Sequence, residues 1–348
     1  ILAAIPHKVI TTFKTFSYGS EECFIAKKCS NIVGAKNYSI EIDYNDAIKS
    51  SGEKVININD GMNTIATSIL LPAYEKMRGK IDVCFNGNPG DGSLGGGYLK
   101  KKLFRIKNDT EFINYVKKTK ENDKIFSKSE INKLFSISTG EFGNTIDKSL
   151  EDILHLNISS NPANRYDTLI MYYIRQRRYT MLGDDHIRSK FEEALPFYDN
   201  DFFDVVSIIP PKWRIHHRIY RKFLLKLAPE LSKIKYLKTG ISVESPIFLW
   251  KGSILYQRII RRLRHIILIL SRGLIALKEN KNYVEAKDLL RTNENWQKFV
   301  KEKLDRLPED IFDKIFINKL FEEHVNSKKN NMEKLFRLVS FSIYYNKY

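Results

Sequence analysis

The first hundred residues alternate between strand-like and helix-like patterns of hydrophobic and polar positions. Residues 9–18 (VITTFKTFSY) are rich in β-branched and aromatic side chains, which predicts a strand. A helix is expected next, from an N-cap at Ser20 to a stop at Gly34, because apolar residues recur there with helical spacing. The same patterns predict a second strand at 38–43, a helix at 60–78 and a third strand at 81–85. Strands separated by helices pair in parallel, so this part predicts an α/β fold.

Beyond residue 100, glycine becomes sparse, lysine and arginine become frequent, and helical periodicity dominates. The long stretches with this periodicity are 214–227, 254–277, 296–307 and 332–345. The polar, charged stretch 107–144 predicts a mobile insertion. We therefore expect an α/β part over residues 1–100, followed by a mainly helical part over residues 101–348.

A glycine-rich segment, residues 87–98, directly follows the third predicted strand and holds six glycines and one carboxylate, Asp91. Ligands of parallel α/β sheets bind at the carboxyl ends of the strands, where this segment lies. Glycines let backbone N–H groups approach an anion, and a carboxylate beside phosphates can hold Mg²⁺. The spacing matches neither the Walker nor the dinucleotide motif, so an ordinary tight connection stays open as an alternative.

Two later segments carry further candidate residues. Residues 191–199 (FEEALPFYD) predict a helix–turn–helix packing unit, in which Pro196 starts a new element and Phe197 enters the core. Residues 236–242 (YLKTGIS) place Lys238 close to a flexible glycine. A lone loop lysine is usually a solvated charge, whereas in a phosphate site it would neutralise pyrophosphate oxygens as a leaving group forms.

Composition narrows the class of protein. Charged residues make up 28% of the chain and hydrophobic residues 43%, which excludes an acidic disordered tail, a collagen-like chain and a disulfide scaffold. Three irregularly spaced cysteines predict free thiols in a reducing compartment. The most apolar stretch, 254–277, is interrupted by arginines and cannot span a bilayer. We therefore expect a cytoplasmic protein with no membrane partner.

The positive charge raises a nucleic-acid hypothesis. The chain carries 58 Lys and Arg against 41 Asp and Glu, a net charge of +17, with basic runs at 212–226 and 258–272. In the second run arginine alternates with isoleucine and leucine, which is typical of a helix with one buried apolar face and one solvated basic face. We expect no nucleic-acid partner, because a polyanionic nucleotide substrate accounts for the same charge balance.

Together, and in this order, the segments resemble the synthetase domain of glutamine-dependent asparagine synthases. That family has a loop G-x-G-x-D-x-x-F/L-G-G-Y after a strand, and similar positions hold Gly87, Asp91, Leu94, Gly95, Gly96 and Tyr98. A later motif, E-x-R-x-P-F-L-D, is similar to the segment with Glu192, Pro196, Phe197 and Asp199. The motif R-x-K-x-G-F-S is matched by Lys238, Gly240 and Ser242. The resemblance extends over nearly the whole chain.

The resemblance implies one synthetase domain over residues 1–348. Its implied fold is a parallel-sheet ATP-pyrophosphatase-like core, of the adenine nucleotide α-hydrolase type, followed by a mainly helical C-terminal region. The implied reaction uses ATP and Mg²⁺ to adenylate a carboxylate, aspartate in the family, and releases pyrophosphate. Ammonia, released from glutamine by a separate domain, then attacks the adenylate to form an amide.

The resemblance also implies site residues. Asp91 would coordinate Mg²⁺ on the pyrophosphate, and Lys238 would be the catalytic residue that stabilises charge on the α-phosphate and the leaving pyrophosphate. The nucleotide would be bound around the glycine-rich segment, at Gly87, Gly90, Gly92 and Tyr98.

The chain departs from the family pattern at several positions. The pyrophosphate loop S-G-G-x-D-S is absent, and residues 1–5 resemble the helix that follows it, so we expect a fragment with that loop and a glutaminase domain upstream. Asn88 lies near the place of a family glutamate, Ala194 replaces the arginine of E-x-R-x-P, and Tyr198 replaces the leucine of P-F-L-D. These departures leave a non-catalytic relative, acting as a binding or assembly module, as an alternative. A homodimer also stays open.

Overall fold

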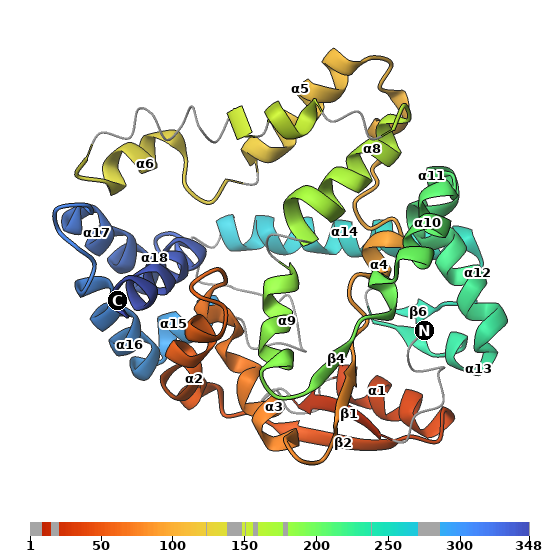
Figure 1. The fold of residues 1–348 in the computed structure, drawn as a ribbon, viewed down its shortest axis with the longest axis horizontal. Coiled ribbons are helices and arrows are strands. Elements are labelled where there is room, and N and C mark those ends of the chain that lie inside the picture. The colour runs from red at the N-terminus through yellow and green to blue at the C-terminus, as the bar shows by residue number, and fades with distance from the viewer. Residues whose placement is uncertain are drawn as a thin grey trace. The chain divides into compact units, whose positions relative to one another are not determined.

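The chain folds into two compact units, each built from two separated stretches. A computed structural model describes residues 9–14, 21–122, 124–137, 148–149, 151–155, 159–176, 180–237, 239–270 and 286–347. The first unit comprises residues 1–44 and 218–285, and the second comprises residues 45–217 and 286–348. Both are mixed α/β and mostly helical (Figure 1).

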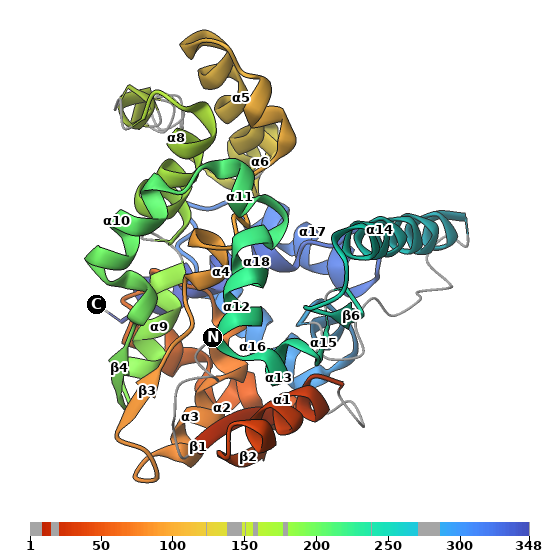
Figure 2. The ribbon, with the colours of Figure 1, turned by 90° about the vertical axis from the view of Figure 1, so that its right-hand side faces the viewer.

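The first unit contains a parallel strand pair joined through a helix. Its early elements are β1 (Val9–Lys14), α1 (Glu21–Ile32) and β2 (Lys36–Glu41). β1 and β2 pair in parallel, from Val9 opposite Lys36 to Lys14 opposite Glu41, and α1 packs against both strands (Figure 2). A crossover helix is the usual way to join parallel strands. The strand–helix–strand order predicted from the sequence is confirmed here.

The later stretch of the first unit leads into a long helix. Its elements are α12 (Arg218–Leu227), α13 (Pro229–Ser232), the antiparallel strands β5 (Lys235–Tyr236) and β6 (Ile241–Ser242), and α14 (Ile247–Leu270). Leu224, Val243 and Trp250 are buried together. Arg221 donates from Nε to the Val243 carbonyl at 3.0 Å, and its guanidinium lies 4.6 Å from the centroid of the Trp250 ring. These contacts join α12 and the start of α14 to the β5–β6 hairpin.

The second unit holds another parallel pair. Its early elements are α2 (Tyr44–Ile58), η2 (Ile65–Ile69), α3 (Leu71–Met77), β3 (Val83–Phe85), α4 (Gly90–Ser93) and η3 (Lys101–Arg105). β3 pairs with β4 (Glu192–Ala194), from Val83 opposite Glu192 to Phe85 opposite Ala194 (Figure 2). Among the described residues, the parallel strands thus form two separate two-stranded pairs, with one further isolated parallel bridge between Arg78 and Ile81.

Helices between β3 and β4, and after β4, build the core of this unit. They are α5 (Asp109–Asn122), α6 (Lys128–Leu134), α8 (Pro162–Thr168), the π-helix η4 (Leu169–Ile174), α9 (Met181–Arg188), η6 (Pro196–Tyr198), α10 (Asn200–Ile208), α11 (Pro211–Arg214) and η7 (Ile215–His217). Leu103, Phe112, Val116 and Leu169 are among the residues of one buried cluster. The stretch expected to be an insertion therefore supplies two core residues through α5.

Four C-terminal helices complete the second unit: α15 (Ala286–Thr292), α16 (Glu294–Asp305), α17 (Lys314–Val325) and α18 (Met332–Tyr345). The Trp296 and Phe336 rings join α16 to α18, with centroids 5.9 Å apart. Early and late parts of the chain also meet. A Cβ at Gly52 in α2 would lie 2.9 Å from the Phe299 ring, and the Ile65 N–H donates to Ser340 Oγ at 3.1 Å.

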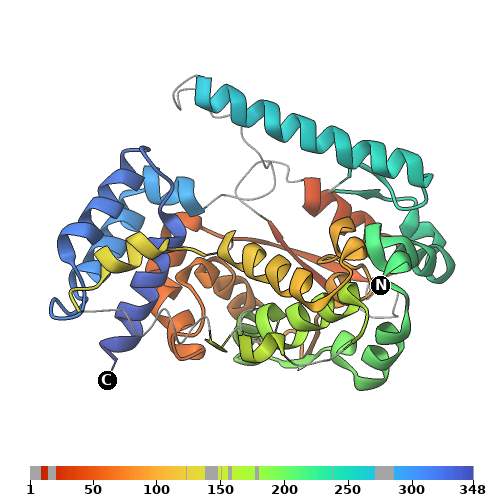
Figure 3. The same cartoon turned by 90° about the horizontal axis from the view of Figure 1, so that it is seen from above.

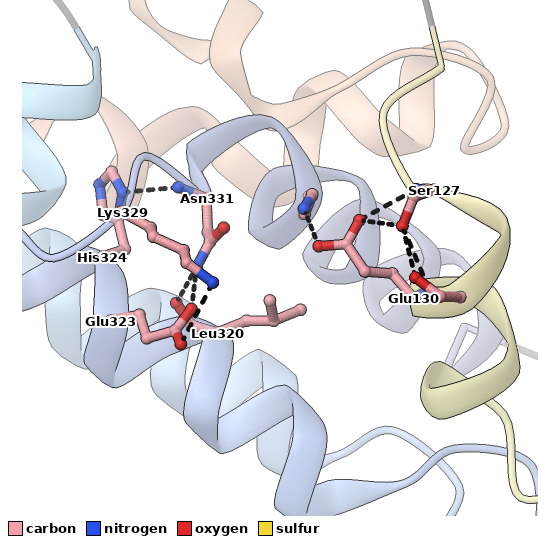
Figure 4. Close-up of polar contacts among 9 residues, drawn as sticks. Ser127, Glu130, Leu320, Glu323, His324, Lys329 and Asn331 are labelled. Atoms are coloured by element: carbon pink, nitrogen blue, oxygen red, sulfur yellow. Dashed lines mark hydrogen bonds and ion pairs between the residues drawn. The ribbon is translucent and has the colours of Figure 1, made fainter. Parts of the chain in front are cut away.

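A buried histidine joins the turn between α17 and α18. Nδ1 of His324 accepts a 3.1 Å hydrogen bond from the Asn331 N–H (Figure 4). Nε2 lies 3.1 Å from the Lys287 carbonyl oxygen. The Asn331 side-chain amide donates to the Leu320 carbonyl at 3.0 Å. Figure 4 also shows the capping box at the start of α6, formed by Ser127 and Glu130.

The segment around residue 192 corrects one sequence prediction. The expected helix before Pro196 is wrong: α9 ends at Arg188 and residues 192–194 form β4. Glu and Ala favour helices, but pairing with β3 overrides that local preference. The predictions for the next two residues are confirmed: Pro196 starts a new element, η6, and Phe197 is buried. The expected helix at 60–78 is divided into η2 and α3, and α2 has no counterpart among the predicted elements.

Candidate functional site

The glycine-rich segment leaves β3 at the end where the parallel pair with β4 closes. The Asn86 N–H donates to the Ala194 carbonyl at 2.9 Å, one residue beyond the last strand pair. Residues 86–89 turn the chain, and α4 begins at Gly90. The segment therefore lies at the carboxyl end of two parallel strands, as the sequence predicts, although a short helix occupies part of the expected loop.

Close packing explains three glycines of this segment. A Cβ at Gly90 would lie 3.0 Å from the Phe197 ring, and one at Gly92 would lie 3.1 Å from the Tyr98 ring and 3.2 Å from Met171 Sδ. Gly96 has a φ of +60°, and a Cβ there would lie 2.8 Å from the Arg214 carbonyl carbon. A side chain at Gly96 would therefore displace the Arg214 backbone, whereas one at Gly90 or Gly92 would require small shifts of neighbouring side chains.

The structure brings most of the predicted nucleotide-site residues together. Gly87 and Gly90 are joined by a 2.9 Å hydrogen bond from the Gly90 N–H to the Gly87 carbonyl. Tyr98 packs beside Gly92 and accepts a 2.9 Å hydrogen bond from Gln176 Nε2. The backbone of Asp91 lies in α4, but its side chain is outside the described part of the structure.

Lys238 lies outside the described residues altogether. It follows β5 in the first unit, whereas the glycine-rich segment belongs to the second unit. Its expected place beside the phosphates therefore stays a prediction.

A polar cluster that sequence reasoning missed surrounds the start of the segment. Asn86 Nδ2 donates to Asp184 Oδ1 at 3.0 Å and to Glu193 Oε1 at 2.7 Å. Asn88 Nδ2 donates to Asp184 Oδ2 at 3.0 Å, and the Asn88 N–H donates to Asn86 Oδ1 at 3.0 Å. Arg188 Nε lies 2.9 Å from Glu193 Oε2. These bonds hold residues 86–88 against α9 and β4.

Burial dominates the electrostatics of this cluster. It raises the pKa of Asp184 against the lowering effect of the Asn88 and Asn86 amides. It also raises the pKa of Glu193, and the Asp184 charge adds to that increase. Two carboxyl groups near one another, with raised pKa values, are a common feature of functional sites. One sequence signal was available: Asn86 directly follows a predicted strand, where ligand-binding residues of parallel sheets gather.

An ion pair supports the segment from its other end. Arg214 Nη1 binds Asp167 Oδ2, and both side chains are about 4% exposed. Arg214 Nη2 also donates to Asn164 Oδ1 at 2.5 Å. Burial raises the pKa of Asp167 to about 6, although Arg214 opposes that shift. Gly96 packs against the Arg214 backbone. The ion pair between Arg214 and Asp167 therefore helps to hold the backbone against which the end of the glycine-rich segment packs.

A cavity of about 600 Å³ adjoins the segment. It is lined by Thr168, Met171, Tyr173, Met181, Tyr198, Asn200 and Phe203, none of which is charged. Met171 also contacts Gly92, so the cavity and the glycine-rich segment share a wall. Tyr198 Oη is buried with no hydrogen-bond partner in the described part of the structure. A polar group at the edge of an apolar cavity is a usual feature of small-molecule sites.

Within the described residues, no three His, Cys, Asp or Glu side chains gather as metal ligands would. Asp91 remains the carboxylate of the glycine-rich segment, and carboxylate oxygen is a ligand that Mg²⁺ accepts. The polar cluster contributes two more carboxylates, but amide and guanidinium donors already bind both of them.

A comparison with models of protein families identifies the family of this chain. The model for asparagine synthase matches residues 1–232. The chain belongs to the asparagine synthase family. The matched region includes both parallel strand pairs, the glycine-rich segment and the polar cluster, whereas Lys238 and α14 lie beyond it. No curated protein sequence matches the chain. Family membership supports an ATP-dependent amide-forming ligase at the level of the family.

Within the described ranges, each helix is too short or too polar to cross a bilayer.

Proposed function

We propose that this protein forms an amide in two steps at the glycine-rich segment. A carboxylate oxygen of the acceptor attacks the α-phosphorus of ATP, which breaks the α–β phosphoanhydride bond and releases pyrophosphate. Ammonia then attacks the acyl carbon of the adenylate, loses a proton, and displaces AMP. The observation that carries the proposal is the position of residues 87–98 at the carboxyl end of the β3–β4 pair, in a chain of the asparagine synthase family.

The residues would act mainly by positioning and by charge. Gly87, Gly90, Gly92 and Tyr98 would form the wall against the nucleotide. Asp91 would hold Mg²⁺, which neutralises phosphate charge when it is bound. Lys238 would stabilise negative charge on the α-phosphate and the pyrophosphate. Glutamine, hydrolysed by a separate glutaminase domain, would supply the ammonia.

The cavity beside the segment favours an acceptor other than aspartate. Aspartate carries three charges, and burying a charge without a charged or hydrogen-bonding partner is costly. Among the described residues, the seven that line the cavity offer two amide or hydroxyl groups outside the tyrosines, and none of these seven is charged. We therefore propose that the acceptor carboxylate carries a large apolar or aromatic group, which lies between Met171 and Phe203.

Pyrophosphate release tests the reaction. The full-length protein is supplied with ATP, Mg²⁺, ammonia and a panel of carboxylates that includes aspartate and aromatic amino acids. Asp91→Asn and Lys238→Ala are each expected to lower the rate about 100-fold, as the loss of a preorganised charge does in other enzymes. Matched controls are Asp82→Asn and Lys233→Ala, which change exposed residues outside the proposed site. Equal rates for the control and test variants would refute these roles.

A second candidate function, a non-catalytic binding module, is favoured by one observation. Asn88, which lies near the position of a family glutamate, donates its amide to Asp184 instead of offering a carboxylate. Titration with ATP and Mg²⁺ separates the two functions. Binding without pyrophosphate release from any carboxylate supports the module, and release supports the ligase.

A further inference from the structure

Helix α14 presents two different faces along its length. It is 24 residues long, which corresponds to about 36 Å, and it runs unbroken in the structure (Figure 3). Its sequence contains Lys251 and arginines at 258, 261, 262 and 264, and no Asp or Glu. The sequence alone predicts that the apolar face of this basic stretch is buried.

One face of α14 is fixed against its own unit. Trp250 is 2% exposed and stacks on Tyr236 of β5, with ring centroids 5.5 Å apart and planes 14° apart. Arg221 of α12 lies over the same indole. One helical turn further on, Ser253 Oγ donates to the Thr239 carbonyl. These contacts set the rotation of α14 about its axis.

The opposite face is apolar and exposed, so the prediction of a buried apolar face is wrong for this helix. Phe248 is 67% exposed, Leu255 58%, Ile259 47% and Leu263 49%. Intervals of seven and four residues place these side chains in one stripe. Ile266 and Ile267 extend the stripe, and Leu249 and Tyr256 widen it. A continuous exposed apolar stripe of this kind marks an interaction surface.

A row of cations runs along one edge of this stripe. Lys251, Arg258 and Arg262 are all exposed and lie seven and four positions apart, which places them on one side of the helix. The stripe thus has an apolar centre and a basic edge. A helix with apolar and basic faces of this kind binds in the plane of a membrane interface.

We propose that the exposed face of α14 binds an anionic lipid surface, with the helix axis parallel to the plane of the membrane. The stripe would enter the boundary between headgroups and acyl chains, and the cation row would contact lipid phosphates and carboxylates. The net charge of +17 adds a long-range attraction to the same surface. This mode requires no membrane-spanning helix, and it replaces the expectation, based on the lack of such a helix in the sequence, that the protein has no membrane partner.

Charge and shape favour lipid over two other occupants. A second copy of the helix would bring its own cation row and no carboxylate, so it would offer no opposite charge to these cations. Nucleic acid would satisfy the cations, but the apolar stripe would then face phosphates and water. An anionic bilayer offers negatively charged headgroups to the cation row and acyl chains to the apolar stripe at the same surface.

Vesicle co-sedimentation of the full-length protein tests the proposal. We expect binding to phosphatidylcholine vesicles that contain phosphatidylserine, weaker binding at high salt, and little binding to phosphatidylcholine alone. Leu263→Glu is expected to weaken binding about tenfold or more. Its matched control is Ile315→Glu, since Ile315 is 83% exposed on α17 and lies outside the stripe.

The cation row has its own pair of variants. Arg258→Gln with Arg262→Gln should reduce binding to anionic vesicles, whereas Lys128→Gln with Lys133→Gln on the exposed side of α6 should leave it unchanged. Circular dichroism verifies that each variant folds. Absence of vesicle binding overturns the proposal. So does a dimer that Leu263→Glu dissociates, or binding to oligonucleotides that depends on the arginines and occurs without vesicle binding.

Discussion

The Asn86 side-chain amide donates a 2.7 Å hydrogen bond to the Glu193 carboxylate, between residues 107 positions apart in the chain. Asn86 follows β3 and Glu193 lies in β4, so this bond joins the two strands beyond their backbone pairing. The same amide also donates to Asp184. One side chain thus positions the entry to the glycine-rich segment.

Replacing this amide should destabilise the second unit. Asn86→Ala removes one hydrogen-bond donor from each of two partly buried carboxylates, Asp184 and Glu193, which is expected to lower the free energy of unfolding by about 1–3 kcal/mol. Urea denaturation followed by circular dichroism measures the change. Asn57→Ala is the control, because Asn57 is exposed on α2 and should change stability by less than about 0.5 kcal/mol. Equal effects of the two substitutions would contradict the role of Asn86.

The buried Asp167 should make stability fall as pH rises. Burial raises its folded-state pKa from 3.8 to about 6, so between these values the folded protein binds more protons than the unfolded chain. The contribution is fully present below pH 3.8 and is lost as pH rises through about 6. Asp167→Asn should remove this dependence, although it weakens the contact with Arg214. Urea denaturation across this range, beside the exposed control Asp82→Asn, measures the slope; an unchanged slope in Asp167→Asn contradicts the prediction.

His324 should produce the opposite dependence on pH. Burial lowers its folded-state pKa below the usual 6.5, and Nδ1 accepts from the Asn331 N–H, which requires an unprotonated nitrogen. The contribution of His324 to stability is therefore fully present above pH 6.5, and it is lost as the pH falls from 6.5 towards the lowered pKa of the folded state. His324→Gln should flatten this fall, whereas His155→Gln, at an exposed histidine, should preserve it. Thermal unfolding at a series of pH values distinguishes the two.

Glycine substitutions separate packing from backbone strain. Gly79 and Gly96 both have positive φ, but a Cβ at Gly79 meets no atom within 4 Å, whereas one at Gly96 approaches the Arg214 backbone. Gly79→Ala should cost about 1 kcal/mol from strain alone. Gly96→Ala should cost an additional 1–3 kcal/mol, roughly, because the Arg214 backbone must move. Equal losses on urea denaturation would mean that the segment tolerates a side chain at Gly96.

Local sequence patterns predicted the positions of helices and strands better than they predicted which other segments these elements contact. The stretch 332–345 coincides with α18 because an apolar stripe facing a core has a strong period. β4 was missed because three residues, Glu192 to Ala194, favour a helix and become a strand only through β3, more than a hundred positions earlier. The exposed stripe of α14 shows the same limit. Periodicity shows that the helix has an apolar face, but not what covers it.

The sequence predicted the glycine-rich segment of the candidate site but not the carboxylates beside it. Glycines after a strand indicate where the chain must turn, so residues 87–98 were found from the sequence. Asp184 and Glu193 carry no local signal, because their importance comes from the Asn86 and Asn88 amides that reach them. Tertiary hydrogen bonds of this kind have no spacing rule along a chain.

The hydrogen bond from Ile65 to Ser340 bears on how this protein can be divided experimentally. The family match ends at residue 232, yet α2 and η2 pack against α16 and α18, which lie far beyond that boundary. A piece cut at residue 232 would expose apolar side chains of α2 and leave the Ile65 N–H without its acceptor. The family match and the compact second unit therefore end at different residues, and a deletion should follow the boundary of the compact unit.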